Sequence, residues 1–175
     1  MKKLLAIGLS SLLFLSACGS DETKAPEDAG NGGESSAADK TEAKRELMRF
    51  YMAVPNAINE VDGELNMFEQ QQEKDLLPEG SELAELKESA GISAEETVAV
   101  VETIEIPESL SGNEEKIQSA LDLIAESYKL KAGALAEEET SFEPANEKFS
   151  EADEIFNALL VENELIPSSL QNEVN

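Results

Sequence analysis

From residue 41 onward, apolar residues recur at alternating spacings of four and three, which is the pattern of an amphipathic helix. The first such stripe consists of Leu47, Tyr51, Val54, Ile58, Val61, Leu65 and Phe68. Pro55 lies inside it, but the stripe keeps its phase, which favours one kinked helix over two. The Leu-Pro-Glu-Gly sequence at 77–80 is expected to end this helix.

Two further stripes predict two more long helices. One consists of Ile117, Leu121, Ile124, Tyr128, Ala132 and Leu135, and the other of Phe142, Ala145, Phe149, Ala152, Phe156 and Leu159. The first of these helices is expected to end in the acidic run 137–139. The second is expected to begin near Pro144, because the first turn tolerates proline, and to stop before Pro167.

The segment between the first and second long helices predicts two short helices. Ser81 is a candidate cap for the first, which would run to about residue 90 and stop at Gly91. Ser93 and Glu96 form a capping-box pattern that would open the second, through about residue 104. The valines at 98, 100 and 101 also suit a strand, but no partner strand is visible in the sequence, which favours a helix.

The predicted fold class is therefore all-α: an antiparallel helical bundle of three long amphipathic helices plus short connecting helices. We expect this bundle to occupy residues 41–170 as one domain, followed by a tail at 171–175.

The chain begins MKKLLAIGLSSLLFLSAC, in which a positively charged start precedes a short apolar run. That run is too short to span a membrane and matches a secretory signal. Leu15-Ser16-Ala17-Cys18 resembles the lipobox of bacterial lipoprotein precursors. The resemblance implies that the Cys18 thiol receives a diacylglyceryl group and that cleavage before it removes residues 1–17 as a signal peptide. The alternative is an ordinary signal peptide with a chance cysteine.

Residues 18–40 would then be the lipidated Cys18 and a flexible acidic tether. Positions 19–40 contain no aromatic and no large aliphatic side chain. The lipobox, tether and helical domain together resemble small uncharacterised helical lipoproteins of Gram-positive bacteria. This implies a lipid-anchored protein on the outer face of the cell membrane. The resemblance supplies no activity.

Composition narrows the chemistry further. The 175 residues include 13 Lys and Arg against 38 Asp and Glu, for a formal charge of −25, with no His, no Trp and one Cys. Zinc sites that need His or several Cys, His-based catalysis and nucleic-acid binding are therefore disfavoured. Neither nucleophile nor nucleotide motifs nor an EF-hand pattern occur, so we expect no enzyme, cofactor or metal site. Both tyrosines, Tyr51 and Tyr128, are expected in the core with their hydroxyls at its rim.

Two groups of side chains are candidate sites. Lys40, Lys44, Arg45 and Arg49 crowd together where the first helix leaves the tether. They would contact anionic headgroups or wall polymer, or else form ion pairs with acidic neighbouring helices. Met48, Phe50 and Met52 widen the apolar face of the same helix and suit a partner surface, unless the short middle helices cover them.

The function expected from these features is that of a membrane-anchored extracytoplasmic lipoprotein with a helical protein-interaction or scaffold domain. Its partners would be the membrane, through the lipid on Cys18, and a protein that the sequence does not identify. The alternative is a lipoprotein that binds a small ligand or cation in a pocket between helices. A buried cavity ringed by polar groups would favour the second function, and an exposed apolar patch the first.

Overall fold

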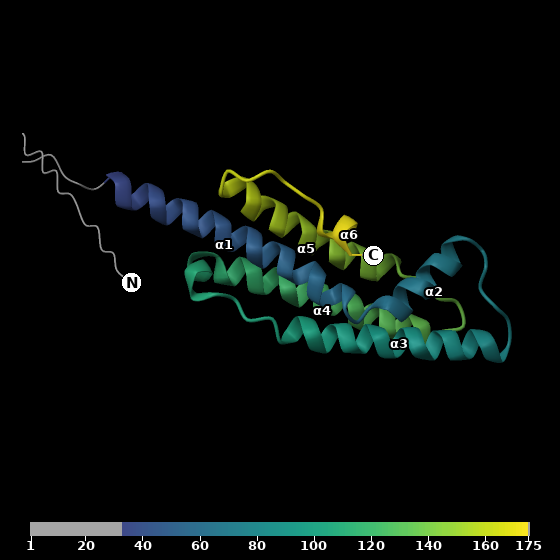
Figure 1. The fold of residues 1–175 in the computed structure, drawn as a ribbon. Helices are drawn as coiled ribbons and strands as arrows, with labels where there is room; N and C mark the ends of the chain where they lie inside the picture. Colours follow the sequence, from purple (N-terminus) through teal and green to yellow (C-terminus); the bar gives the residue numbers. More distant parts are fainter. Residues whose placement is uncertain (1–32, 175) are drawn as a thin grey trace, which may run out of the picture. The chain divides into compact units, whose positions relative to one another are not determined.

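The structure, a computed structural model, describes residues 33–174, with side chains from Lys40 onward (Figure 1). These residues form α1 (Gly33–Asn59), α2 (Gly63–Glu73), α3 (Ser81–Glu102), α4 (Glu114–Leu135), α5 (Glu143–Glu162) and α6 (Leu170–Glu173), with a 3₁₀ helix, η1 (Glu108–Asn113), before α4. No residue of this range lies in a strand. The all-α prediction is confirmed.

The bundle is built around α4, which packs along both α3 and α5 (Figure 1). These three helices run antiparallel, because short connections join each to the next. Helix α2 packs on α3, and α1 contacts α3 and η1. The predicted stripes face the core: Tyr51, Ile58, Phe68, Ile124 and Phe156 are fully buried. Burial of these stripes provides the main stabilisation of the fold.

The first predicted helix is two helices, so the prediction of one kinked helix was wrong. Pro55 lies inside α1 without ending it. The break comes at residues 60–62, where the Val61 and Asp62 amides both donate to the Ile58 carbonyl, at 3.0 and 3.1 Å. The chain then resumes as α2, with the Asn66 amide donating to the Asp62 carbonyl at 2.9 Å.

The two predicted short helices are one, because α3 runs unbroken through Gly91 and Ser93. Ser93 lies inside α3 and does not cap it. It is buried, its hydroxyl donates to the Val61 carbonyl at 2.7 Å, and the Leu65 amide donates to its oxygen at 3.4 Å. Ser93 thus satisfies backbone groups at the α1–α2 break, which would otherwise be buried without partners. The described residues therefore contain four long helices, α1, α3, α4 and α5, rather than three.

Both ends of the domain differ from the predicted boundaries. Helix α1 already begins at Gly33, so residues 33–40, expected in the tether, are helical. At the other end, the expected tail is part of the fold through residue 174. Leu170 is buried, its amide donates to Asp153 Oδ1 at 2.6 Å, and Val174 packs against the core. The predicted signal peptide, Cys18 and the first part of the predicted tether lie outside the described residues.

Candidate functional site

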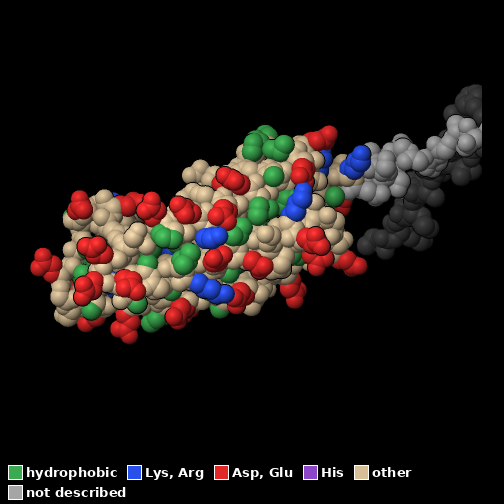
Figure 2. Space-filling view, turned by 180° about the vertical axis from the view of Figure 1, so that it is seen from behind, with side chains coloured by type: hydrophobic (Ala, Val, Ile, Leu, Met, Phe, Trp, Pro, Cys, Tyr) green, Lys and Arg blue, Asp and Glu red, His purple; other side chains and the backbone are tan. Residues whose placement is uncertain are grey.

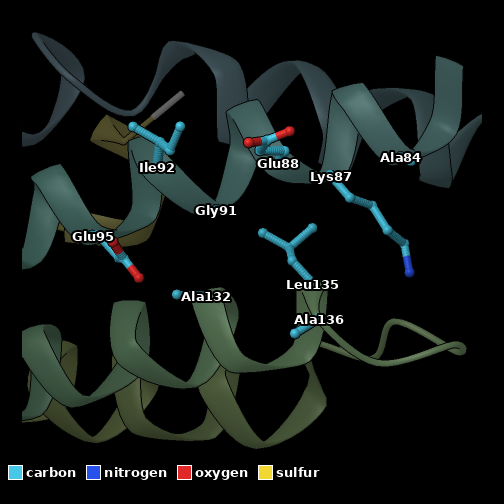
Figure 3. Close-up of a pocket in the computed structure, with 9 residues that line it drawn as sticks. All are labelled: Ala84, Lys87, Glu88, Gly91, Ile92, Glu95, Ala132, Leu135 and Ala136. Atoms are coloured by element: carbon cyan, nitrogen blue, oxygen red, sulfur yellow. The ribbon is translucent and has the colours of Figure 1, made fainter. Parts of the chain in front are cut away.

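A surface groove of about 440 Å³ lies between α3 and α4 (Figure 3). Its lining is Ala84, Lys87, Glu88, Gly91, Ile92, Glu95, Ala132, Leu135 and Ala136. Leu135 projects from α4 into the space between the two helices (Figure 3). Ile92 is 53% exposed, which is unusual for an isoleucine in a packed helix pair. The groove is therefore an apolar surface that is open to solvent.

Small residues keep this groove open. A Cβ atom added at Gly91 would meet nothing within 4 Å, so no close packing requires glycine there. Glycine inside a helix costs about 1 kcal/mol relative to alanine. Facing it, α4 presents Ala132 and Ala136 rather than larger side chains. Gly91 thus lowers the stability of α3 and leaves the groove deeper than a larger residue would.

The rim of the groove is acidic. Lys87 does not neutralise the acidic rim. Its ammonium donates to the carbonyls of Glu137 and Glu138, at 2.6 and 3.4 Å, just beyond the end of α4. A cation suits that end of a helix. Among the described residues, Glu88 and Glu95 form no ion pair. Asp and Glu side chains also dominate the face in Figure 2.

A second, polar cleft of about 210 Å³ lies among α2, α4, α5 and α6. Its lining is Asn66, Glu69, Glu73, Tyr128, Lys131, Asn146, Phe149, Gln171 and Val174. Lys131 is only 8% exposed and pairs with Glu69 Oε1 at 2.6 Å. The Lys131 ammonium also lies over the rings of Tyr128 and Phe142, 5.2 and 5.7 Å from their centroids. These contacts compensate for burying its charge.

Asp62 lies behind the wall of this polar cleft and is 1% exposed. The Tyr128 hydroxyl donates to its Oδ2 at 3.3 Å, whereas Oδ1 has no hydrogen bond within the described residues. Burial raises the pKa of Asp62, although Asn66, Tyr128 and Lys131 each favour its charged form. Burial also raises the pKa of Tyr128, and the charges of Asp62 and Glu69 raise it further.

The environment of Asp62 is unusual for its position in the chain. It stands immediately before α2, where an aspartate normally caps the helix, yet its side chain makes no capping hydrogen bond. Both tyrosines are core residues as predicted, but neither hydroxyl lies at the rim: that of Tyr128 is buried against Asp62, and that of Tyr51 is buried as well. A buried carboxylate oxygen without a partner needs a physical explanation.

The three residues of the predicted partner surface do not form one surface. Met52 is 39% exposed, and Met48 is half-buried against the core. Phe50 is buried, with its ring centroid 6.4 Å from that of Phe156 in α5. Phe50 is therefore covered rather than available to a partner, and Phe156 of α5 is one of the residues that cover it.

The basic cluster lies inside α1, which begins seven residues before Lys40, and ion pairs account for most of the cluster. Lys44 pairs with Glu164, Arg45 with Glu42 at 2.9 Å, and Arg49 with Glu46. Lys44, together with the charge of Lys40, lowers the pKa of Glu164. These pairs favour the ion-pair alternative, although two of them are within α1 rather than to another helix. Contact with headgroups or wall polymer stays a prediction.

No three Asp or Glu residues of the described chain lie close enough together to hold a metal ion. Within the same range, no helix has the length and apolar character needed to cross a membrane. No protein-family model matches the chain, and no curated protein or solved structure matches it either. Function is therefore argued from the groove and the cleft.

Sequence reasoning missed Gly91, Asp62 and Lys131. Gly91 was interpreted as a helix stop. A signal for Lys131 was present: the spacing 117, 121, 124, 128, 131, 135 alternates strictly between four and three and passes through Lys131 rather than Ala132. A lysine on an apolar stripe indicates either a buried ion pair or a polar site.

Proposed function

We propose that this protein is a lipid-anchored extracytoplasmic interaction protein that holds a basic amphipathic helix of a partner protein in the α3–α4 groove. The observation that carries the proposal is Gly91, a glycine that no packing contact requires, on an open apolar groove. A residue that breaks a local preference without a structural reason is expected at functional sites.

The shape of the groove suits a helix. Helices α3 and α4 lie side by side and flank an apolar floor. This arrangement can receive the apolar face of a third helix. A second hollow of about 490 Å³ shares Glu95, Ala132 and Ala136 with the groove and adds Val98, Lys129 and Gly133. A Cβ added at Gly133 would also meet nothing within 4 Å. Gly133 is thus a further small residue of α4 beside open space.

Charge selects the class of partner. Glu88 and Glu95 line the groove and form no ion pair with any residue that the structure describes, and the whole chain carries a formal charge of −25. An acidic partner would be repelled, whereas Lys and Arg flanking an apolar helical face would meet these carboxylates. The lipid anchor would hold the groove near the membrane surface, which favours encounter with a partner that is also membrane-bound.

The anchor is tested at Cys18. Cys18→Ser should abolish incorporation of labelled lipid, because formation of the thioether bond needs the thiol. Undiminished labelling of the Ser variant would contradict the lipobox assignment.

The groove is tested with Gly91→Gln, which places a long side chain in the open space. We expect binding of a short synthetic helix of Leu and Lys residues to weaken about tenfold or more, which corresponds to about 1.4 kcal/mol. The fold should be retained, and the melting temperature should rise slightly because glutamine favours helix more than glycine. Fluorescence anisotropy of the labelled peptide provides the measurement.

The matched control is Gly112→Gln. Gly112 lies in η1, also has open space around its Cβ position, and does not line the groove. The control should bind the peptide as the parent does. Equal weakening in both variants, or equal binding of a peptide with Glu in place of Lys, would contradict the proposal.

A further inference from the structure

We infer that the polar cleft between α2, α4, α5 and α6 binds a short aliphatic amine in its ammonium form. This site is separate from the α3–α4 groove and shares no lining residue with it. It gives a specific form to the alternative function, binding of a small ligand between helices. The charges around the cleft, its aromatic and amide lining, and its volume all suit such a ligand.

The charges around the cleft are unbalanced. Three carboxylates lie in or directly behind its wall, those of Asp62, Glu69 and Glu73, against the one ammonium of Lys131. Lys131 is engaged by Glu69, which leaves Glu73 at the opening and Asp62 behind Tyr128. Asp62 does not line the cleft, so it acts on a ligand there through its charge, whereas Glu73 is the carboxylate that a ligand can contact. A bound cation would correct this imbalance.

The remaining lining favours an organic cation over a metal ion. No three carboxylates converge in the described residues, so a metal would lack ligands. The rings of Tyr128 and Phe149 lie in an edge-to-face arrangement, with centroids 6.3 Å apart, and both border the cleft. Aromatic faces attract ammonium groups. The side-chain carbonyls of Asn66, Asn146 and Gln171 add hydrogen-bond acceptors for N–H groups.

The size of the cleft limits the ligand. Its 210 Å³ corresponds to about seven water molecules at roughly 30 Å³ each. A chain of four carbons with one or two amino groups fits this volume. The site is therefore built for a ligand of metabolite size or smaller.

The C-terminal segment forms one side of the cleft. Gln171 and Val174 line it, and they are held in place by burial of Leu170 and by two hydrogen bonds. The Leu170 amide donates to Asp153 Oδ1 at 2.6 Å, and the Asn59 side-chain amide donates to the Glu173 carbonyl at 2.8 Å. These contacts fix the positions of Gln171 and Val174 in the lining of the cleft.

The test is calorimetric titration of the full chain in non-ionic detergent with diaminobutane, at about 0.15 M NaCl so that diffuse attraction to the acidic surface is screened. We expect saturable binding at one site per chain. Butanediol, which has the same length and no charge, should not bind. Glu73→Gln should weaken diamine binding about tenfold or more, since it removes a charge-assisted hydrogen bond.

Glu79→Gln is the matched control, because Glu79 is exposed and does not line the cleft, and it should bind like the parent. Glu73 is exposed as well, so its variant is expected to fold. Gly91→Gln should leave diamine binding unchanged, which separates this site from the groove. Absence of saturable binding, equal affinity for butanediol, or equal weakening by the two Glu→Gln variants would overturn the inference.

Discussion

Phe156→Ala should lower the free energy of unfolding by about 3–5 kcal/mol, the range for removing a buried aromatic side chain. Phe156 is fully buried in α5 and contacts two rings of α1. Its centroid lies 6.4 Å from that of Phe50 and 5.9 Å from that of Tyr51. The change removes the ring that joins α1 to α5 and leaves a cavity in the core.

Urea denaturation of the full chain in detergent, followed by circular dichroism, gives the free energy of unfolding. Val161→Ala is the control in the same helix, because Val161 is 57% exposed and its loss should cost less than about 0.5 kcal/mol. If Phe156→Ala were as mild as this control, α1 would not be packed on α5 as described.

Lys131→Met should destabilise the protein by about 3 kcal/mol at neutral pH, because breaking a buried ion pair leaves an uncompensated charge. Methionine keeps much of the aliphatic volume between the rings of Tyr128 and Phe142. Glu69, however, loses its partner at 2.6 Å, and Asp62 loses a cation that favours its charged form. Two carboxylates would then face each other's charge in a poorly solvated site.

The destabilisation caused by Lys131→Met should become smaller as the pH falls. Without Lys131, the pKa of folded Asp62 rises further above its unfolded value, near 3.8, so the native state binds more protons than the unfolded state. Stability of the variant then rises relative to the parent as the pH falls from neutral toward about 4. Protonation removes the charges that the variant leaves unpaired. Urea midpoints measured across this range test the sign.

Lys129→Met is the control for the lysine substitution. Lys129 is two residues earlier in α4 and pairs with Glu102 at 2.7 Å, but both side chains are more than half exposed. Exposed pairs contribute about 0–1 kcal/mol, so this variant should melt close to the parent with little dependence on pH. Equal effects of the two substitutions would mean that Lys131 is not buried as described.

Much of the helical architecture follows from the sequence. The spacing of apolar residues predicted the buried faces of α1, α4 and α5, and Pro144 correctly marked the start of α5. This succeeds because an amphipathic helix buries one stripe whatever it packs against. The lipobox around Cys18 is likewise a property of the sequence, and it stays a prediction because it lies outside the described residues.

The tertiary structure decided where helices break and which polar groups are buried. Gly91 and Ser93 are typical of helix boundaries, yet α3 runs through both, because packing against α2 and α4 outweighs a local cost of about 1 kcal/mol. Ser93 acts on the α1–α2 break, 28 to 32 residues away in the chain. No local pattern contains that contact.

The sequence alone thus determined the helical class and the apolar stripes of the long helices, because both follow from spacing along one helix. The candidate sites needed the tertiary structure. The groove exists because Gly91 of α3 faces the small residues of α4, and the cleft because Glu69 of α2 and Lys131 of α4 meet. Such sites depend on which helices are neighbours, and that is set by the packing of the whole core.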